Sequence, residues 1–301
     1  MSQAAGAPQP FRKRRPVVFF LLCAFGVFCA VLLARAGLRH GDDTGLFSGP
    51  RLGIIRIEGF IGDAEKVAAW AEKLRRDKTV AGVLVRINSP GGAVAPSQEM
   101  HQAVARLAAA KPVVVSMGAV ASSGGYYIAV AGREIFANPS TLTGSIGVKM
   151  QLANLEGLMA VLGVKTENLA TGIYKDAASP FKTMTPEERA YLEGILSDMQ
   201  EEFVAAVAAG RNMAPEAVRA VADGRAFTGR KALELKLIDA LGDQEAALMR
   251  LMALAGMGEM PSRILDGPEK SRPLWKELIL GLLGHDAPAL FDRHTYEFQY
   301  R

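Results

Sequence analysis

The feature of this sequence that most constrains the fold is a buried strand running directly into a glycine-rich turn. Residues 112–118 read PVVVSMG, and this β-branched run indicates a strand that ends in glycine. Residues 119–127, AVASSGGYY, follow, and residues 126–131 are apolar enough for a buried helix. A serine before two glycines at such a turn presents a hydroxyl beside uncovered backbone N–H groups. The turn therefore suits a nucleophile next to an oxyanion site, and a plain capped turn is the alternative interpretation.

Strands and helices alternate on both sides of this turn. Such alternation predicts an α/β fold with a largely parallel sheet, whose ligands bind at the carboxyl ends of the strands. NSPGG at 88–92 and SSGG at 122–125 both follow a predicted strand, so we expect two glycine turns to converge on one carbonyl. The predicted strands are 51–58, 80–87, 112–118 and 133–137, and the predicted helices are 63–76, 94–110, 185–209, 212–222, 229–235 and 244–255.

The N-terminal part of the chain has the pattern of a membrane anchor. Residues 17–34 form an uncharged apolar run, and this run is long enough for one transmembrane helix. Four positive charges in residues 11–16 precede it, against Arg35 and Arg39 after it, so we expect a cytoplasmic N-terminus and an outer catalytic domain. A cleaved signal peptide is the alternative. The run is long for one, and Ala34-Arg35-Ala36 is the single candidate cleavage motif.

Composition and motifs exclude several other classes of function. The net charge is only +4, and the sequence has no cluster of basic residues interleaved with aromatic ones, so we expect no nucleic-acid partner. Cys23 and Cys29 both lie inside the apolar run, so they build no disulfide framework for the following domain. The sequence has no Walker motif and no clustered metal ligands, so we expect neither a nucleotide cofactor nor a metal.

A nucleophilic serine needs a neighbouring base, and the sequence offers no obvious histidine. His40 lies in the predicted tether, His285 and His294 lie in a polar tail, and His101 falls on a predicted helix with a structural role expected. A buried lysine of lowered pKa is the alternative base. The candidates near glycine-rich or apolar sequence are Lys111, Lys149, Lys165, Lys175 and Lys182. The S-x-x-K pattern at 179–182 lacks its K-T-G partner, so we discount it.

Several motifs, in order, resemble signal peptide peptidase A in its short bacterial and archaeal form. They are INSPGG, ASSGGYY, TLTGSIGV, YKDAASPF and VADGRAFTGRKALELKLIDALG, and the resemblance covers about residues 52–254. It implies a ClpP/crotonase-like α/β spiral of βα units, here preceded by one N-terminal transmembrane helix. It also implies a dome-like homo-oligomeric ring, an octamer in the short form, in which serine and lysine meet across neighbouring protomers.

The resemblance implies residue roles as well. Ser123, rather than Ser122, matches the nucleophile, Lys175 matches the general base, and Ser145 matches the residue that orients this lysine. Asp176 is a weaker candidate for assisting the base.

Backbone N–H groups complete the site that the resemblance implies. The oxyanion hole is formed by Gly124 together with either Gly91 or Gly92. The implied task is cutting remnant signal peptides after their release from preproteins, at the inner (plasma) membrane and on its periplasmic side. Peptides and membrane lipid are then the partners. A crotonase-like acyl-CoA enzyme and a catalytically silent membrane scaffold are the alternatives.

The domain organisation follows from these patterns. We expect a cytoplasmic N-terminus, a transmembrane helix, a tether, a peptidase domain and a C-terminal extension. Their predicted bounds are 1–16, 17–34, 35–50, 51–258 and 259–301.

Overall fold

The computed structural model describes residues 25–27, 49–261 and 263–268, and it divides the chain into units 1–48 and 49–301. In the first unit, residues 25–27 are helical, and the rest of the predicted transmembrane segment, residues 17–34, lies outside the described residues. The search for membrane spans covered only the described residues, and none of their helices has the length and apolarity to cross a bilayer. Nearly all of the predicted tether and most of the C-terminal extension also lie outside the described part.

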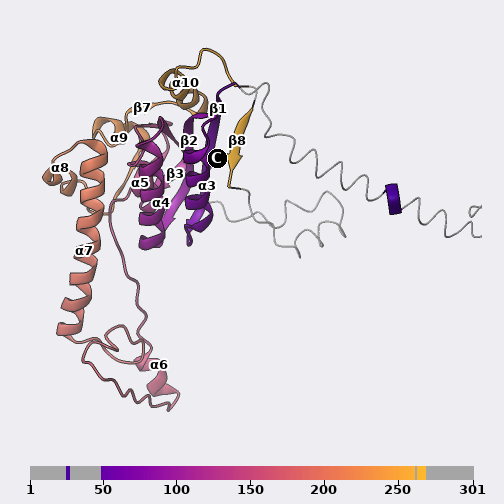
Figure 1. The fold of residues 1–301 in the computed structure, drawn as a ribbon. Coiled ribbons are helices and arrows are strands. Elements are labelled where there is room, and N and C mark those ends of the chain that lie inside the picture. The colour runs from indigo at the N-terminus through magenta and orange to yellow at the C-terminus, as the bar shows by residue number, and fades with distance from the viewer. Residues whose placement is uncertain (1–24, 28–48, 262, 269–301) are drawn as a thin grey trace, which may run out of the picture. The chain divides into compact units, whose positions relative to one another are not determined.

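An eight-stranded sheet forms the centre of the second unit (Figure 1). Its middle strands β1, β2 and β3 are parallel neighbours, which confirms the prediction from the alternating pattern, and β6 is antiparallel to β5. β3 forks, because its first half pairs with β4 and its last residues pair with β5. The strands are β1 (Arg51–Ile61), β2 (Val80–Gly92), β3 (Val113–Ser122), β4 (Glu134–Ala137), β5 (Leu142–Gly144), β6 (Ala226–Thr228), β7 (Ala240–Leu241) and β8 (Ile264–Gly267).

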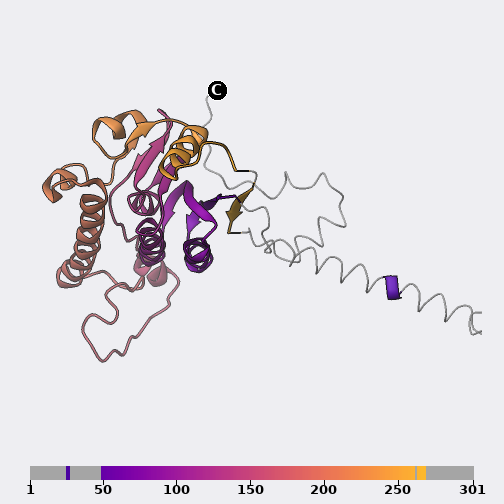
Figure 2. The same cartoon turned by 45° about the horizontal axis from the view of Figure 1, so that its top comes forward.

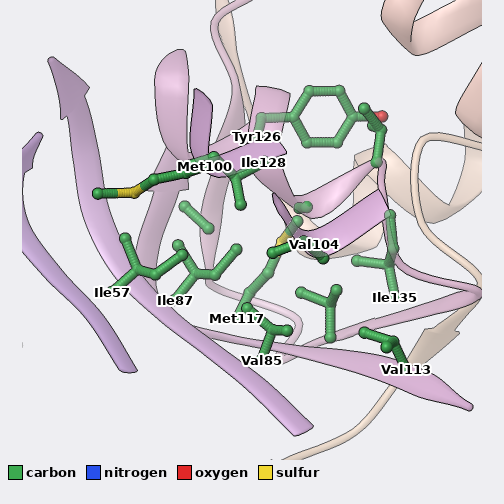
Figure 3. Close-up of a cluster of buried hydrophobic side chains, with 14 of the residues drawn as sticks. Ile57, Val85, Ile87, Met100, Val104, Val113, Met117, Tyr126, Ile128 and Ile135 are labelled. Carbon is green, nitrogen blue, oxygen red and sulfur yellow. The ribbon is translucent and has the colours of Figure 1, made fainter. Parts of the chain in front are cut away.

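Helices cover both faces of the sheet because both faces of its middle strands are apolar. Ile55, Val85 and Val115 belong to the larger core, shown in part in Figure 3, which α3, α4, α5 and α7 cover. Leu84 and Val114 face the other way and meet α10. The helices are α3 (Glu65–Arg76), α4 (Val94–Ala108), α5 (Gly124–Ala129), α6 (Glu156–Val161), α7 (Pro186–Arg211), α8 (Pro215–Arg219), α9 (Gly229–Glu234) and α10 (Gln244–Leu254).

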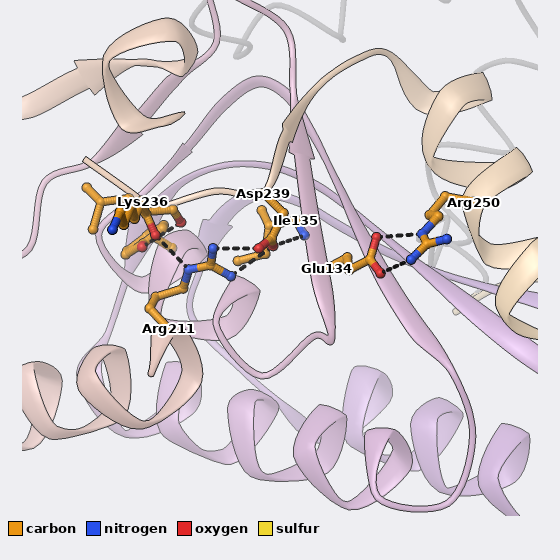
Figure 4. A network of polar contacts seen from close by, with 8 residues as sticks. Glu134, Ile135, Arg211, Lys236, Asp239 and Arg250 are labelled. Carbon is orange, nitrogen blue, oxygen red and sulfur yellow. Dashed lines mark hydrogen bonds and ion pairs between the residues drawn. The ribbon is translucent and has the colours of Figure 1, made fainter. Parts of the chain in front are cut away.

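Ion pairs tie the last helices to the sheet. Figure 4 shows Arg211, at the end of α7, against Asp239, at 2.8 Å between Nη2 and Oδ1. Asp239 also accepts a hydrogen bond from the backbone N–H of Ile135 in β4 at 2.7 Å. Arg250 of α10 pairs with Glu134 at the start of the same strand, at 2.6 Å. Contacts with Asp239 and with Arg250 therefore both hold strand β4. Because β4 pairs with β3, these contacts also stabilise the strand that leads into the β3–α5 turn.

The NSPGG segment differs from the prediction. It is not a turn after β2 but the last part of that strand, which continues to Gly92 and pairs with β1 through a register shift near Phe60. Positive φ angles at Gly59 (71°) and Gly91 (99°) let both strands bend there together. The prediction missed this because asparagine, proline and two glycines are typical of turns, whereas here they form an irregular strand pair.

The segment between β5 and α7 carries the predicted base and is drawn away from the sheet in Figures 1 and 2. Between residues 149 and 175 every residue except the half-buried Met159 is exposed, and α6 has no buried residue. We call residues 149–183 the arm. Several large apolar side chains of the arm are exposed, among them Leu158, Val161, Leu169 and Ile173.

Candidate active site

Ser123 lies at the junction of β3 and α5, where the sequence predicts the nucleophile. It is the N-cap of α5 and has φ 53° and ψ −123°, a conformation that a side chain rarely adopts. The carbonyl of Gly144 accepts its N–H at 2.8 Å, and its own carbonyl accepts the N–H of Tyr127 at 2.8 Å. Two backbone hydrogen bonds therefore hold this strained turn, and the Ser123 side chain lines the pocket described below.

The neighbouring Ser122 points elsewhere. It is buried, and its hydroxyl donates to the carbonyl of Pro90 at 3.3 Å. The two serines of the motif therefore differ in role. Ser122 is buried at the end of β3 with its hydroxyl bonded, whereas Ser123 lines the pocket.

The glycines of the two motifs lie against each other, as the sequence predicts. A side chain at Gly91 would meet Ser123 Cβ and Gly124 N at 2.8 Å, and one at Gly124 would lie 3.4 Å from Gly92 N. The N–H of Gly91 is taken, because it donates to Ser89 Oγ at 3.1 Å. Ala93 N–H bonds to Ile61 in β1 at 2.8 Å, so the N–H of Gly92, one residue earlier, points away from β1. Between the two glycines that the prediction left open, Gly92 is the better partner for Gly124.

An apolar pocket opens over Ser123. Its walls come from the end of β2, the start of α4, the start of α5, the segment that follows β5, and the middle of α7. Tyr127 supplies the one titratable side chain among the described residues that line it, and burial raises the pKa of that phenol. Residues lining the pocket include Gly92, Ser97, Ser123, Tyr127, Met199 and Phe203.

Ser145 is close to Ser123 through the backbone. Ser122 and Gly144 are register partners in β3 and β5, so the residues that follow them leave the sheet side by side. Ser145 has a φ of 52°, almost the same as Ser123, and its hydroxyl donates to the carbonyl of Gly224 at 3.1 Å. The structure thus brings Ser145 to the site, but its described contact is Gly224 and not a lysine.

The candidate lysines have distinct surroundings, and none of them lines the pocket. Lys111 donates to the carbonyls of Leu74 and Asp77, and it precedes the start of β3, whereas Ser123 follows the end of that strand. Lys182 is paired with Asp176 and Glu188, and its hydrogen bond to Glu188 raises the pKa of its ammonium. The other three, Lys149, Lys165 and Lys175, are exposed on the arm.

His101 does not serve Ser123 in this arrangement. Its ring meets Tyr127 edge to face at 5.0 Å between centroids, and Tyr127 in turn meets Phe203. Burial lowers the pKa of this imidazole, which agrees with the structural role that the sequence suggests. Among the residues that the structure describes, no three histidine, cysteine or carboxylate side chains gather as metal ligands would.

Comparison with known proteins identifies the family. The model of Peptidase family S49 matches residues 105–258, and that of Clp protease matches residues 58–143. A Synechocystis sp. protein named "Putative protease" is 42% identical over 75% of this chain and 82% of its own length. One of the same name from Methanocaldococcus jannaschii is 31% identical over 86% and 87%. The Enterococcus faecium "Putative signal peptide peptidase SppA" is 39% identical over 59% of this chain and 52% of its own length.

The chain belongs to peptidase family S49. It is a serine protease with a ClpP-like α/β fold, as the resemblance in its motifs predicts. In this S49 peptidase the pocket is lined by a serine at a strained turn together with Gly92 and Gly124, and a serine beside glycine backbone is an arrangement suited to acyl transfer. It holds no base from its own chain among the described lining residues.

Sequence reasoning missed two contributors to this S49 site. Ser97 lies under Gly124, and its hydroxyl is fixed by a hydrogen bond to the carbonyl of Ala93 at 2.8 Å. Met199 and Phe203 of α7 also line the pocket. The sequence signal that could have identified Ser97 is a small residue in the first helical turn after NSPGG. No pattern near the glycine motifs could have identified α7 as part of the site.

Proposed function

We propose that this S49 peptidase is a membrane-anchored endopeptidase that uses Ser123 and Lys175 as a Ser-Lys dyad to cut remnant signal peptides. The observation that carries the proposal is the separation of the two residues. Ser123 lies in an apolar pocket without a lysine, histidine or carboxylate in its described lining, whereas Lys175 is exposed on the arm. The dyad therefore forms when the arm of a second copy brings its Lys175 to the pocket.

The exposed apolar surface of the arm supports such an assembly. Val161, Leu169 and Ile173 are 84%, 91% and 79% exposed, a large apolar area to leave in water. Burying this surface against a neighbour in a homo-oligomeric ring gains hydrophobic free energy. It also creates the water-poor setting that a neutral lysine requires. The size of the ring in the short form of the family, an octamer, is carried over as part of the proposal.

The mechanism then follows from the groups at the pocket. Neutral Lys175 of one protomer takes the proton of Ser123 Oγ on its neighbour, and the alkoxide attacks the peptide carbonyl. The N–H groups of Gly92 and Gly124 stabilise the oxyanion, and the lysine returns its proton to the leaving amine. Water, deprotonated by the same lysine, hydrolyses the acyl-enzyme. Ser145, beside Ser123 in the fold, orients the incoming amine of Lys175.

The membrane part of the proposal rests on the sequence. The uncharged residues 17–34 and the basic cluster before them support one span with a cytoplasmic N-terminus. The catalytic unit then lies on the periplasmic side of the inner membrane, close to apolar peptides left in the bilayer. The name of the Enterococcus faecium relative is consistent with such substrates.

The test is covalent labelling of the full-length protein by a fluorophosphonate probe, together with hydrolysis of a fluorogenic peptide. We expect the parent to be labelled and active, and Ser123→Ala to lose both. We expect Lys175→Ala to lose at least about 1,000-fold in kcat/KM, because a serine without its base is a poor nucleophile. Ser122→Ala is the matched control and keeps activity.

Two results would overturn the proposal. Activity at the parental level in Lys175→Ala would remove the dyad. A parent that resists labelling and peptide cleavage but binds coenzyme A would favour the acyl-CoA alternative.

A further inference from the structure

Both neighbours of Lys175 in the chain are fastened to the first turns of α7. The ring of Tyr174 stacks on that of Tyr191, with centroids 4.6 Å apart and planes 22° from parallel. On the other side, Asp176 Oδ1 lies 3.2 Å from Lys182 Nζ, and Lys182 also binds Glu188. Glu188 and Tyr191 are three residues apart, so they share one face of the helix. This face of α7 thus holds the arm immediately before and after Lys175.

The anchor on α7 is a rigid one. Glu188 belongs to a capping box, in which one of its carboxylate oxygens accepts the N–H of Thr185 at 3.0 Å. Its own N–H donates to Thr185 Oγ1 at 3.2 Å. The Glu188 side chain is only 6% exposed, whereas that of Lys182 is 34% exposed. Lys182 therefore connects a fixed carboxylate at the helix start to the exposed segment that carries Lys175.

We propose that Lys182 is a positioning residue for Lys175, holding Asp176 against Glu188 so that the arm presents Lys175 in one conformation with the Asp176 charge neutralised. This inference rests on the proposed function, because it takes Lys175 as the general base. Lys182 itself touches no reacting atom. It acts on the residue beside the base and through the backbone of the arm.

The charges around Lys175 predict the direction in which the pH profile of kcat/KM shifts when Lys182 is removed. The base must be neutral to accept a proton, and a free carboxylate on the adjacent Asp176 would favour its charged form. Losing the Lys182 ammonium leaves that carboxylate uncompensated beside the base. We therefore expect the acid limb of the kcat/KM profile to move to higher pH. The other titratable groups on the segments around Lys182 are Glu156, which binds Thr183, the two stacked tyrosines, and the exposed Glu187 and Arg189 in the first turn of α7.

The experiment measures peptide hydrolysis against pH for the full-length protein and for Lys182→Met. We expect kcat to fall roughly 10- to 100-fold, because small displacements of a catalytic group are costly. We expect KM to change little and the acid limb to move up by about one pH unit. Lys182→Arg should restore both quantities, since it keeps the cation.

Three further variants separate this role from a general one. Arg189→Met removes an exposed cation from the same helix start, where it lies 3.9 Å from Glu193, and should leave the profile unchanged. Asp176→Asn combined with Lys182→Met should return the acid limb to its parental position, because the uncompensated carboxylate is gone. Should Lys182→Met fail to fold, as judged by circular dichroism, Lys182→Gln takes its place with the same expectation.

The outcomes keep the two proposals apart. An active Lys175→Ala variant contradicts the dyad, whatever Lys182 does. An inactive Lys175→Ala beside a Lys182→Met whose acid limb stays in place overturns the positioning role and leaves the dyad standing. A loss of kcat that Lys182→Arg does not restore also overturns it.

Discussion

At the scale of single residues, Gly124 has no space for a side chain. A Cβ there would lie 2.3 Å from Ser97 Oγ, and the hydroxyl cannot easily leave because it is bound to Ala93. We predict that Gly124→Ala destabilises the protein by about 1–3 kcal/mol, the usual cost of overpacking, and abolishes peptide cleavage. Urea unfolding and peptide hydrolysis measure the two effects.

A second glycine provides the control for this prediction. Gly194 lies in α7 with no atom within 4 Å of an added Cβ, so Gly194→Ala should stabilise by about 0.5–1 kcal/mol and keep activity. A Gly124→Ala protein with parental stability and activity would show that the turn is looser than described.

At the scale of elements, the start of α7 is held by one carboxylate. The hydrogen bond from Lys182, followed by that from the Thr185 backbone, lowers the pKa of Glu188 below its ordinary value. A lowered pKa in the folded protein contributes stability above about pH 4.3, the unfolded value, and this stability is lost as the pH falls through the folded pKa. We predict that the free energy of unfolding declines less steeply below pH 4.3 in Glu188→Gln than in the parent.

The neighbouring glutamate tests whether this effect is local. Glu187 lies in the same first turn of α7 and is exposed. Urea unfolding of Glu187→Gln between pH 3 and pH 6 should therefore follow the parental slope. Equal slopes for the parent and Glu188→Gln would contradict the role given to the Lys182 contact.

Some helices and strands can be predicted from their local sequence, whereas others form only through contacts with distant strands. The start of helix α7 can be predicted from Thr185, Pro186 and Glu188, because a capping box is a short-range sequence pattern, and the structure contains it. Strands β5, β6 and β8 were not predicted. Each has three or four residues, too few to show a period of two, and each forms only because a distant strand offers its edge.

At the scale of the whole molecule, the proposed dyad requires contact between copies. We predict that inactive Ser123→Ala and inactive Lys175→Ala proteins regain activity when they are unfolded together and reassembled. Random mixing in a ring should restore roughly a quarter of parental cleavage, since an intact serine must meet an intact lysine on its neighbour.

The control for mixing uses a chain with neither group. Ser123→Ala reassembled with the Ser123→Ala, Lys175→Ala double variant should stay inactive, because no intact serine is present. Mixed single variants that also stay inactive, while forming assemblies of parental size by sedimentation, would place serine and lysine on the same chain.

The sequence by itself determined the α/β class, the strand-to-helix turn at Ser123 and the pairing of two glycine motifs. These features rest on hydrophobic periodicity and turn chemistry, which act over a few neighbouring residues. Only the tertiary structure turned Ser122 inward, favoured Gly92 over Gly91 and set Ser145 beside Ser123, because these choices depend on contacts between distant strands. It also tied Lys182 to Asp176 and Glu188 and left Lys175 exposed on the arm. The local sequence does not determine which of several lysines forms an ion pair with a carboxylate. That depends on where α7 begins relative to the arm.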